Sequence, residues 1–211
     1  MPQHWTGRFG LRSRWLTALI VAVALTTTAA QPAHSAAGSG DGSALLSLPW
    51  TPGTAWRLTG GPHSEAGTKV RPWSAVDFQP IGDASGKVRA ARGGWVVRPC
   101  PNLVVLRHAD GWSTSYYHLK GIAVSRGEWA ARGELLGYAS SAAGCGGYAT
   151  GPHLHFSIMR DKSYVNIRDH IIGGWTVREG SAPYAGCMVR GDDRQCASIG
   201  RIHNTGSIGS R

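Results

Sequence analysis

Short hydrophobic runs separated by turn residues make up most of the chain after Trp50, and no long apolar pattern of helical period occurs. Residues 88–94 and 95–99 predict one hairpin around Gly93-Gly94, and residues 102–119 predict a second hairpin with Asp110-Gly111 at its turn. Residues 133–140 and 153–160 predict two further strands. We therefore expect an all-β, mostly antiparallel domain.

Both ends of this domain are predicted from composition. Residues 38–54 are predicted to be a flexible leader, since Gly and Ser are frequent at its start. The β domain is then expected over residues 55–211. Its tail, from about Ser163, is predicted to be a loop-rich extension of the same domain, closed by Cys187 and Cys196.

The first 37 residues have the organisation of a secretory signal peptide. Three arginines precede the apolar run WLTALIVAVAL, which is too short to span a bilayer, and small residues follow up to Ala37. A signal anchor that stays in the membrane is the alternative. Because the segment has no adjacent arginine pair, the general secretion route is expected, and with it an extracellular or cell-wall location.

The net charge of the chain is strongly positive. Removal of residues 1–37, which contain three arginines and no acidic residue, lowers the net charge from +10 to +7. Outside the cell such a charge favours an anionic wall polymer, for example teichoic acid, over nucleic acid. Solubility alone is an alternative reason for the charge, and no obligate protein partner is inferred.

Four cysteines follow the signal segment, and an even number in an exported chain predicts two disulfides. They are Cys100, Cys145, Cys187 and Cys196. Three pairings are possible. A four-cysteine zinc site is the alternative, but the chain has no C-x-x-C knuckle.

Two histidines, His153 and His155, flank Leu154 in the motif GPHLHF. On a strand, alternate side chains share a face, so both imidazoles point the same way about 6–7 Å apart while Leu154 points to the core. The H-x-H pattern alone is weak, because two exposed strand histidines are common by chance. Most of the other histidines are expected in the leader, at the surface or at a turn.

Three further residues raise the value of this motif. Asp77 lies in the apolar run SAVDF, where a carboxylate is costly unless it is paired or binds a metal. His63 follows a Gly-Gly-Pro turn, and two imidazoles with one carboxylate are typical of a catalytic zinc site. His118 ends another predicted strand, with Tyr116 expected on the same face.

The combination of His63, Asp77 in SAVDF, His118 in YYHL and the GPHLHF motif resembles the lysostaphin-type (LytM-domain) zinc endopeptidases, which cut bacterial peptidoglycan. The likeness covers roughly residues 55–200. The long segment between His63 and Asp77 and the two cysteine pairs resemble the staphylolysin (LasA) and β-lytic branch. The resemblance implies an antiparallel β-sandwich or open barrel-like domain.

The resemblance also implies roles for particular residues. His63, Asp77 and His155 would bind one Zn²⁺ per chain, and His118 and His153 would serve catalysis. Tyr116 would donate to the oxyanion or to the substrate. The substrate would be a peptidoglycan cross-link with Gly-Gly or Gly-Ala bonds. The disulfides are expected to join Cys100 to Cys145 and Cys187 to Cys196.

Two other functions fit parts of the sequence. One is a catalytically inactive LytM-like module that binds cell wall or activates another hydrolase, although such modules usually lack at least one of the five site residues. The other is an oxidative copper enzyme with His34 as its N-terminal residue, which would require cleavage after Ala33 with Gln31 at position −3, a poor signal-peptidase site.

Overall fold

The computed structural model describes residues 45–65, 69–82 and 84–207. The predicted signal peptide and His34 therefore lie outside the described residues. Within those ranges every regular element is a strand, so the predicted all-β class is confirmed. No helix of the described residues is long and apolar enough to cross a membrane.

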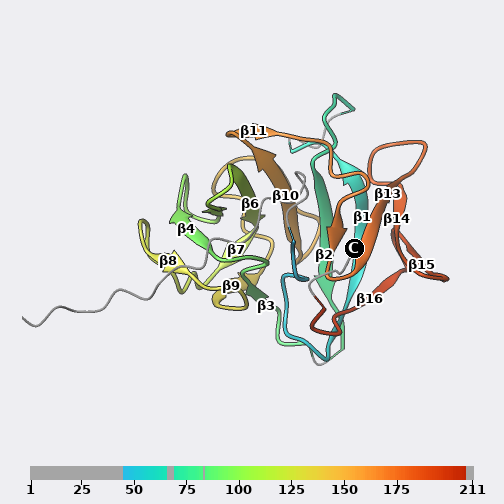
Figure 1. Ribbon diagram of the computed structural model, residues 1–211, viewed down its shortest axis with the longest axis horizontal. Coiled ribbons are helices and arrows are strands. Elements are labelled where there is room, and N and C mark those ends of the chain that lie inside the picture. The colour runs from blue at the N-terminus through green and yellow to red at the C-terminus, as the bar shows by residue number, and fades with distance from the viewer. Residues whose placement is uncertain (1–44, 66–68, 83, 208–211) are drawn as a thin grey trace, which may run out of the picture. The chain divides into compact units, whose positions relative to one another are not determined.

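A nine-stranded antiparallel sheet carries most of the domain (Figure 1). Its strands in spatial order are β16 (Arg201–His203), β1 (Ala55–His63), β2 (Ala75–Pro80), β10 (Leu154–Arg160), β6 (Trp112–Tyr117), β5 (Val104–Arg107), β4 (Gly94–Val97) and β8 (Trp129–Ala130), with β11 (Ser163–Tyr164) paired to β10. The predicted hairpin over residues 102–119 forms as β5 and β6.

Two smaller sheets complete the domain, and neither closes a barrel. One contains β3 (Lys87–Arg89), β9 (Leu135–Ala139) and β7 (Leu119–Lys120). The other contains β12 (Ile171–Ile172), β13 (Trp175–Glu179), β14 (Gly186–Arg190) and β15 (Asp193–Cys196). The tail thus contains more regular structure than its loop-rich prediction suggested, and β16 joins it to β1 of the main sheet.

The hairpin predicted around Gly93-Gly94 is wrong. Strand β3 pairs with β9, whereas β4 pairs with β5 and β8 in the main sheet. Gly94 is needed for a different reason, because a Cβ at this position would lie 2.8 Å from the carbonyl oxygen of Arg107. Gly94 is therefore required by the close packing of β4 on β5, and not by a reversal of the chain.

The prediction of a flexible leader also needs correction for its second half. Leu46, Leu48 and Trp50 are buried in the core, and Trp50 stacks on Trp56 with ring centroids 5.1 Å apart. Trp50 also meets Phe78 edge-on at 5.0 Å. Three large apolar side chains gain more from burial than this short segment loses in conformational freedom, so the segment packs.

Alternation along the central strands separates a core face from a polar face. Phe78 of β2 pairs with Leu154 of β10, and Phe156 pairs with Tyr116 of β6; all four are buried. The neighbouring row contains polar residues, with His155 in register with Asp77 on one side and Tyr117 on the other. Directly opposed residues of antiparallel strands share a face. The core thus lies behind the site, which three adjacent strands hold in register.

Both predicted disulfides are present: Cys100 joins Cys145, and Cys187 joins Cys196. The first bond links the turn after β4 to the loop between β9 and β10. The second bridges β14 and β15 at directly paired positions. No described cysteine is free, so the four-cysteine zinc site does not form.

A buried histidine outside the site predicts a pH-dependent stability. The Nδ1–H of His108 donates to the Gly93 carbonyl, and its Nε2 lies 3.1 Å from the Thr114 hydroxyl. Burial, as the largest cause, lowers the pKa of His108 from 6.5 to about 4. Between these pH values the unfolded chain binds a proton that the folded chain does not. The free energy of unfolding should therefore fall as the pH drops from 6.5 to 4, by at most about 3 kcal/mol from this residue.

Urea unfolding at a series of pH values measures this contribution. In His108→Gln the slope of the free energy of unfolding between pH 6.5 and 4 should be smaller than in the wild type. His203→Gln, at the exposed end of β16, is the matched control and should keep the wild-type slope. Equal slopes in His108→Gln and the wild type would contradict the prediction.

Candidate metal centre

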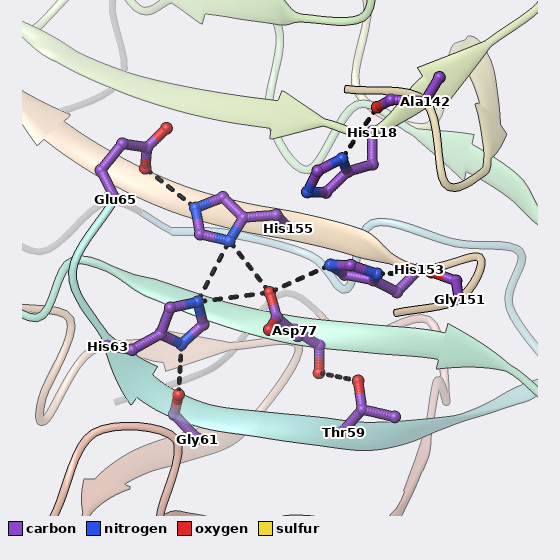
Figure 2. Close-up of polar contacts among 10 residues, drawn as sticks. All are labelled: Thr59, Gly61, His63, Glu65, Asp77, His118, Ala142, Gly151, His153 and His155. Atoms are coloured by element: carbon purple, nitrogen blue, oxygen red, sulfur yellow. Dashed lines mark hydrogen bonds and ion pairs between the residues drawn. The ribbon is translucent and has the colours of Figure 1, made fainter. Parts of the chain in front are cut away.

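Three residues from three adjacent strands converge on one point of the polar face (Figure 2). His63 ends β1, Asp77 lies in β2 and His155 lies in β10. One potential ligand atom from each lies within 4.8 Å of the other two, and all three residues are buried. Residues separated by up to 92 positions in the chain are thus brought together, as the ligand set predicted from the sequence requires.

The distances between these atoms suit a small tetrahedral cation. Asp77 Oδ1 lies 3.0 Å from His155 Nδ1 and 3.4 Å from His63 Nε2, and the two nitrogens are 3.2 Å apart. Ligands at about 2.0–2.1 Å from zinc in a tetrahedral arrangement lie about 3.3 Å from one another. Two imidazoles and one carboxylate also form a donor set that zinc prefers. The residues therefore fit a zinc ion.

Each of the two imidazoles has a hydrogen-bond acceptor on the side away from the meeting point. His63 Nδ1–H donates to the Gly61 carbonyl at 2.7 Å, which leaves the Nε2 lone pair facing Asp77. His155 Nε2 lies 3.1 Å from Glu65 Oε2, and a proton on Nε2 would be donated there and would leave the Nδ1 lone pair on the same side as Asp77. With the His155 proton on Nε2, three electron-pair donors face one another, an arrangement that a shared cation stabilises.

The pKa shifts reflect the same arrangement. Burial raises the pKa of Asp77, but hydrogen bonds from His155 and His63 outweigh it and hold the pKa well below its usual range. Burial lowers the pKa of His155, but hydrogen bonds to Asp77 and Glu65 outweigh it and raise the pKa to about 10. The carboxylate is therefore ionised, and its negative charge favours a cation beside it.

The Gly-Gly-Pro segment before His63 is shaped by close contacts. A Cβ at Gly60 would lie 2.7 Å from Asp77 Oδ2, and a Cβ at Gly61 would lie 2.5 Å from the Ala185 carbonyl oxygen. The register between β1 and β2 shifts on both sides of Gly60. Only glycines leave room for the Asp77 side chain and for the tail, so they place His63 beside Asp77.

The other two predicted site histidines lie next to this cluster. The rings of His118 and His153 are 4.6 Å apart, and His153 Nε2 lies 3.8 Å from Asp77 Oδ1. Each Nδ1–H donates to a backbone carbonyl: His118 to Ala142 and His153 to Gly151. Burial, as the largest cause, lowers the pKa of His118. Both side chains can therefore present an unprotonated Nε2.

Tyr116 does not lie in the site, so its predicted contact with the oxyanion or substrate is wrong. It is fully buried in the core, where its hydroxyl accepts the Ala91 backbone N–H at 2.8 Å. Strand β6 ends at Tyr117, and His118 has a φ of 62°, so strict alternation does not continue to His118. The neighbouring Tyr117 stacks on His118 instead, with ring centroids 4.1 Å apart.

Two residues beside the cluster were not predicted from the sequence. Tyr184, from the loop between β13 and β14, stacks on the His63 ring at 4.0 Å. Glu65 contacts His155 from the loop after β1. The only signal for Glu65 is its position two residues after His63. No local pattern indicates Tyr184, since its place depends on how the tail folds back.

The Cys100–Cys145 disulfide belongs to a braced loop beside His118. The Tyr117 hydroxyl donates to the Gly146 carbonyl at 2.6 Å and accepts the Cys145 backbone N–H. Asn102 accepts the Gly144 backbone N–H and donates to the Leu119 carbonyl. This loop also supplies the Ala142 carbonyl that holds His118, so the bracing fixes the orientation of that ring.

Known proteins are similar to this chain in sequence and in fold. Residues 71–167 match the family model of peptidase family M23. The chain is 36% identical over 150 residues to Protease LasA of Pseudomonas aeruginosa, which covers 67% of this chain and 35% of that protein. It is 28% identical over 148 residues to the beta-lytic metalloendopeptidase of Lysobacter enzymogenes, which covers 66% of this chain and 83% of that protein.

Two further likenesses concern the fold and a named substrate. A solved M23 metalloprotease, pseudoalterin from the deep sea, superposes with a TM-score of 0.66 at 29% identity, over 74% of this chain and 96% of that one. The peptidoglycan DD-endopeptidase ShyA of Vibrio cholerae is 35% identical over 97 residues, 43% of this chain and 21% of that protein. The chain spans about a third of the length of LasA.

Proposed function

Because the chain contains a domain of peptidase family M23, we propose that it is a secreted zinc endopeptidase that hydrolyses peptide bonds in bacterial peptidoglycan cross-links. The observation that carries the proposal is the convergence of three electron-pair donors with two further histidines beside them. The names of the matched proteins support it, since they include metalloendopeptidases and a peptidoglycan endopeptidase.

His63, Asp77 and His155 would hold the zinc ion, through Nε2, a carboxylate oxygen and Nδ1 respectively. Zinc in a site with three protein ligands supplies Lewis acidity, which polarises a scissile carbonyl and makes a water molecule acidic enough to attack at neutral pH. The negative charge of Asp77 would offset part of the charge of the ion, and the hydrogen bonds from His155 and His63 keep the carboxylate ionised despite its burial.

His118 and His153 would move the protons of the reaction. The Nε2 of one ring would accept a proton from the attacking water, since its Nδ1–H is held by a backbone carbonyl. That ring would then be a cation with an N–H donor, which can stabilise the tetrahedral oxyanion and pass the proton to the leaving amine. The rings lie close enough together to act on the same substrate atoms.

The substrate class rests on resemblance and on charge. Gly-Gly or Gly-Ala bonds are proposed because lysostaphin-type enzymes cut such bonds. The net charge of +7 that would remain after signal removal favours an anionic wall around the substrate, including wall polymers that carry phosphate. Two disulfides are consistent with an oxidising location outside the cytoplasm.

Mass spectrometry of fragments released from defined peptidoglycans tests this function. Purified protein with one equivalent of zinc should generate new amino termini at glycine or alanine in the cross-bridge. A chelator should abolish the products, and added zinc should restore them. Peptidoglycans with and without glycine in the cross-bridge, treated in parallel, identify the bond.

The second candidate function is a binding module without catalysis. It would share the fold, and the same assay separates the two. Zinc bound at one equivalent with no new amino termini from any peptidoglycan, but with protein retained on the wall, would favour the module and contradict the proposed hydrolase.

A further inference from the structure

The two ring nitrogens of His155 face different partners. Nδ1 faces His63 and Asp77, whereas Nε2 lies 3.1 Å from Glu65 Oε2 on the opposite side of the ring (Figure 2). The His155 side chain is 7% exposed and that of Glu65 is 24% exposed. Glu65 therefore lies outside the cluster of proposed ligands and contacts His155 on the side of the ring opposite Asp77.

We propose that Glu65 is a positioning residue that holds His155 in the orientation and the tautomer needed to bind zinc through Nδ1. This role rests on the proposed zinc site. The bond to Glu65 requires the proton of neutral His155 to lie on Nε2, which leaves the Nδ1 lone pair for the metal. A carboxylate that accepts the outer N–H of a histidine ligand also makes the ligand a stronger electron donor.

Without Glu65, the His155 tautomer with its proton on Nδ1 becomes more populated. A proton on Nδ1 would be donated to Asp77 Oδ1, which lies only 3.0 Å away, and that nitrogen could not then bind a metal. Glu65 opposes this tautomer because its own oxygen would then face the Nε2 lone pair with no proton between them. Two carboxylates thus compete for one proton, and the position of Glu65 decides which nitrogen is free.

The surroundings of Glu65 suit this task. Glu65 Oε2 lies 3.1 Å from His155 Nε2, and three quarters of the Glu65 side chain is shielded from water. A carboxylate acceptor makes a stronger hydrogen bond than a neutral acceptor does. Glu65 also follows His63 by two residues, so one segment supplies a proposed ligand from β1 and supports the proposed ligand on β10.

Zinc affinity, measured by competition with a chromophoric chelator, tests this role without any substrate. Glu65→Ala should bind zinc about 10- to 100-fold more weakly than the wild type, the usual cost of losing an outer-shell partner. Glu65→Gln keeps an oxygen acceptor of the same shape and should recover a large part of that loss. Glu128→Ala, which removes an exposed glutamate that caps the Ser125 backbone N–H, is the matched control and should bind zinc as the wild type does.

The thermal midpoint of the metal-free proteins separates positioning from folding. We expect metal-free Glu65→Gln to have the same thermal midpoint as the wild type. If Glu65→Ala then loses zinc affinity and Glu65→Gln recovers it, the loss is due to the orientation of His155 and not to unfolding. Zinc binding in Glu65→Ala within twofold of the wild type would overturn the role of Glu65, even if the wild type cleaves peptidoglycan. A wild type that binds zinc but cleaves nothing would overturn the hydrolase alone, since the affinities would still test Glu65.

Discussion

Replacement of His155 by alanine is expected to abolish both stable zinc binding and peptidoglycan cleavage. The described residues offer three convergent ligand atoms, and a catalytic zinc site needs three protein ligands, so no spare group can take the place of Nδ1. The loss of affinity should exceed about 100-fold, the upper end for loss of an outer-shell partner. Elemental analysis after gel filtration and a turbidity assay on cell walls measure the two effects.

The other two ligands should behave in the same way. His63→Ala and Asp77→Ala each remove one corner of the cluster, and Asp77→Ala also removes its only carboxylate. His203→Ala, which removes an exposed histidine at the end of β16, is the control and should retain zinc and activity. Full zinc occupancy together with full activity in His155→Ala would exclude that residue as a ligand.

Replacement of His153 by alanine is expected to give the opposite combination: close to one zinc per chain, but a kcat at least about 100-fold lower, the lower end for a positioned proton-transfer group. His153 Nε2 lies 3.8 Å from Asp77 Oδ1, and His153 is not one of the three residues that converge. Its loss should therefore leave the ligand cluster intact and remove a proton acceptor. The same result is expected for His118→Ala.

Zinc content and kcat must be measured on the same samples. If His153 only packed against its neighbours, the variant would lose some stability and keep its rate. If it were a ligand, zinc would be lost along with activity. Turnover near that of the wild type in either variant would remove that histidine from the mechanism.

Much of the site could be predicted because its residues carry local signals. Asp77 is a charged residue within an apolar run, and His153 and His155 have the spacing of residues on one strand face. Each pattern indicates polar side chains that are grouped at a functional site. Alternation correctly placed Leu154 in the core and His155 on the other face. Period-two patterns were reliable there because β10 lies between two other strands and cannot slip its register.

The sequence-based predictions failed where the position of a residue depends on local backbone geometry or on contacts with distant parts of the chain. Alternation was extended one residue too far at His118, whose positive φ ends the strand and leaves Tyr116 in the core. Gly94 was interpreted as a turn residue, although the close approach of β5 requires it. Glu65 and Tyr184 reach the site through loops, and the sequence contains no periodic signal for such contacts.

The burial of the segment from Leu46 to Trp50 sets a limit on how far proteolytic trimming of the N-terminus can proceed. Trp50 packs on Phe78, the residue next to Asp77 in β2, and on the opposite face of the same sheet from the zinc ligands. A protease that removed residues up to the start of β1 would delete Trp50 and open a cavity behind Asp77, at a cost of about 3–5 kcal/mol for a residue of this size. Trimming past about residue 45 should therefore remove core side chains and destabilise the folded domain.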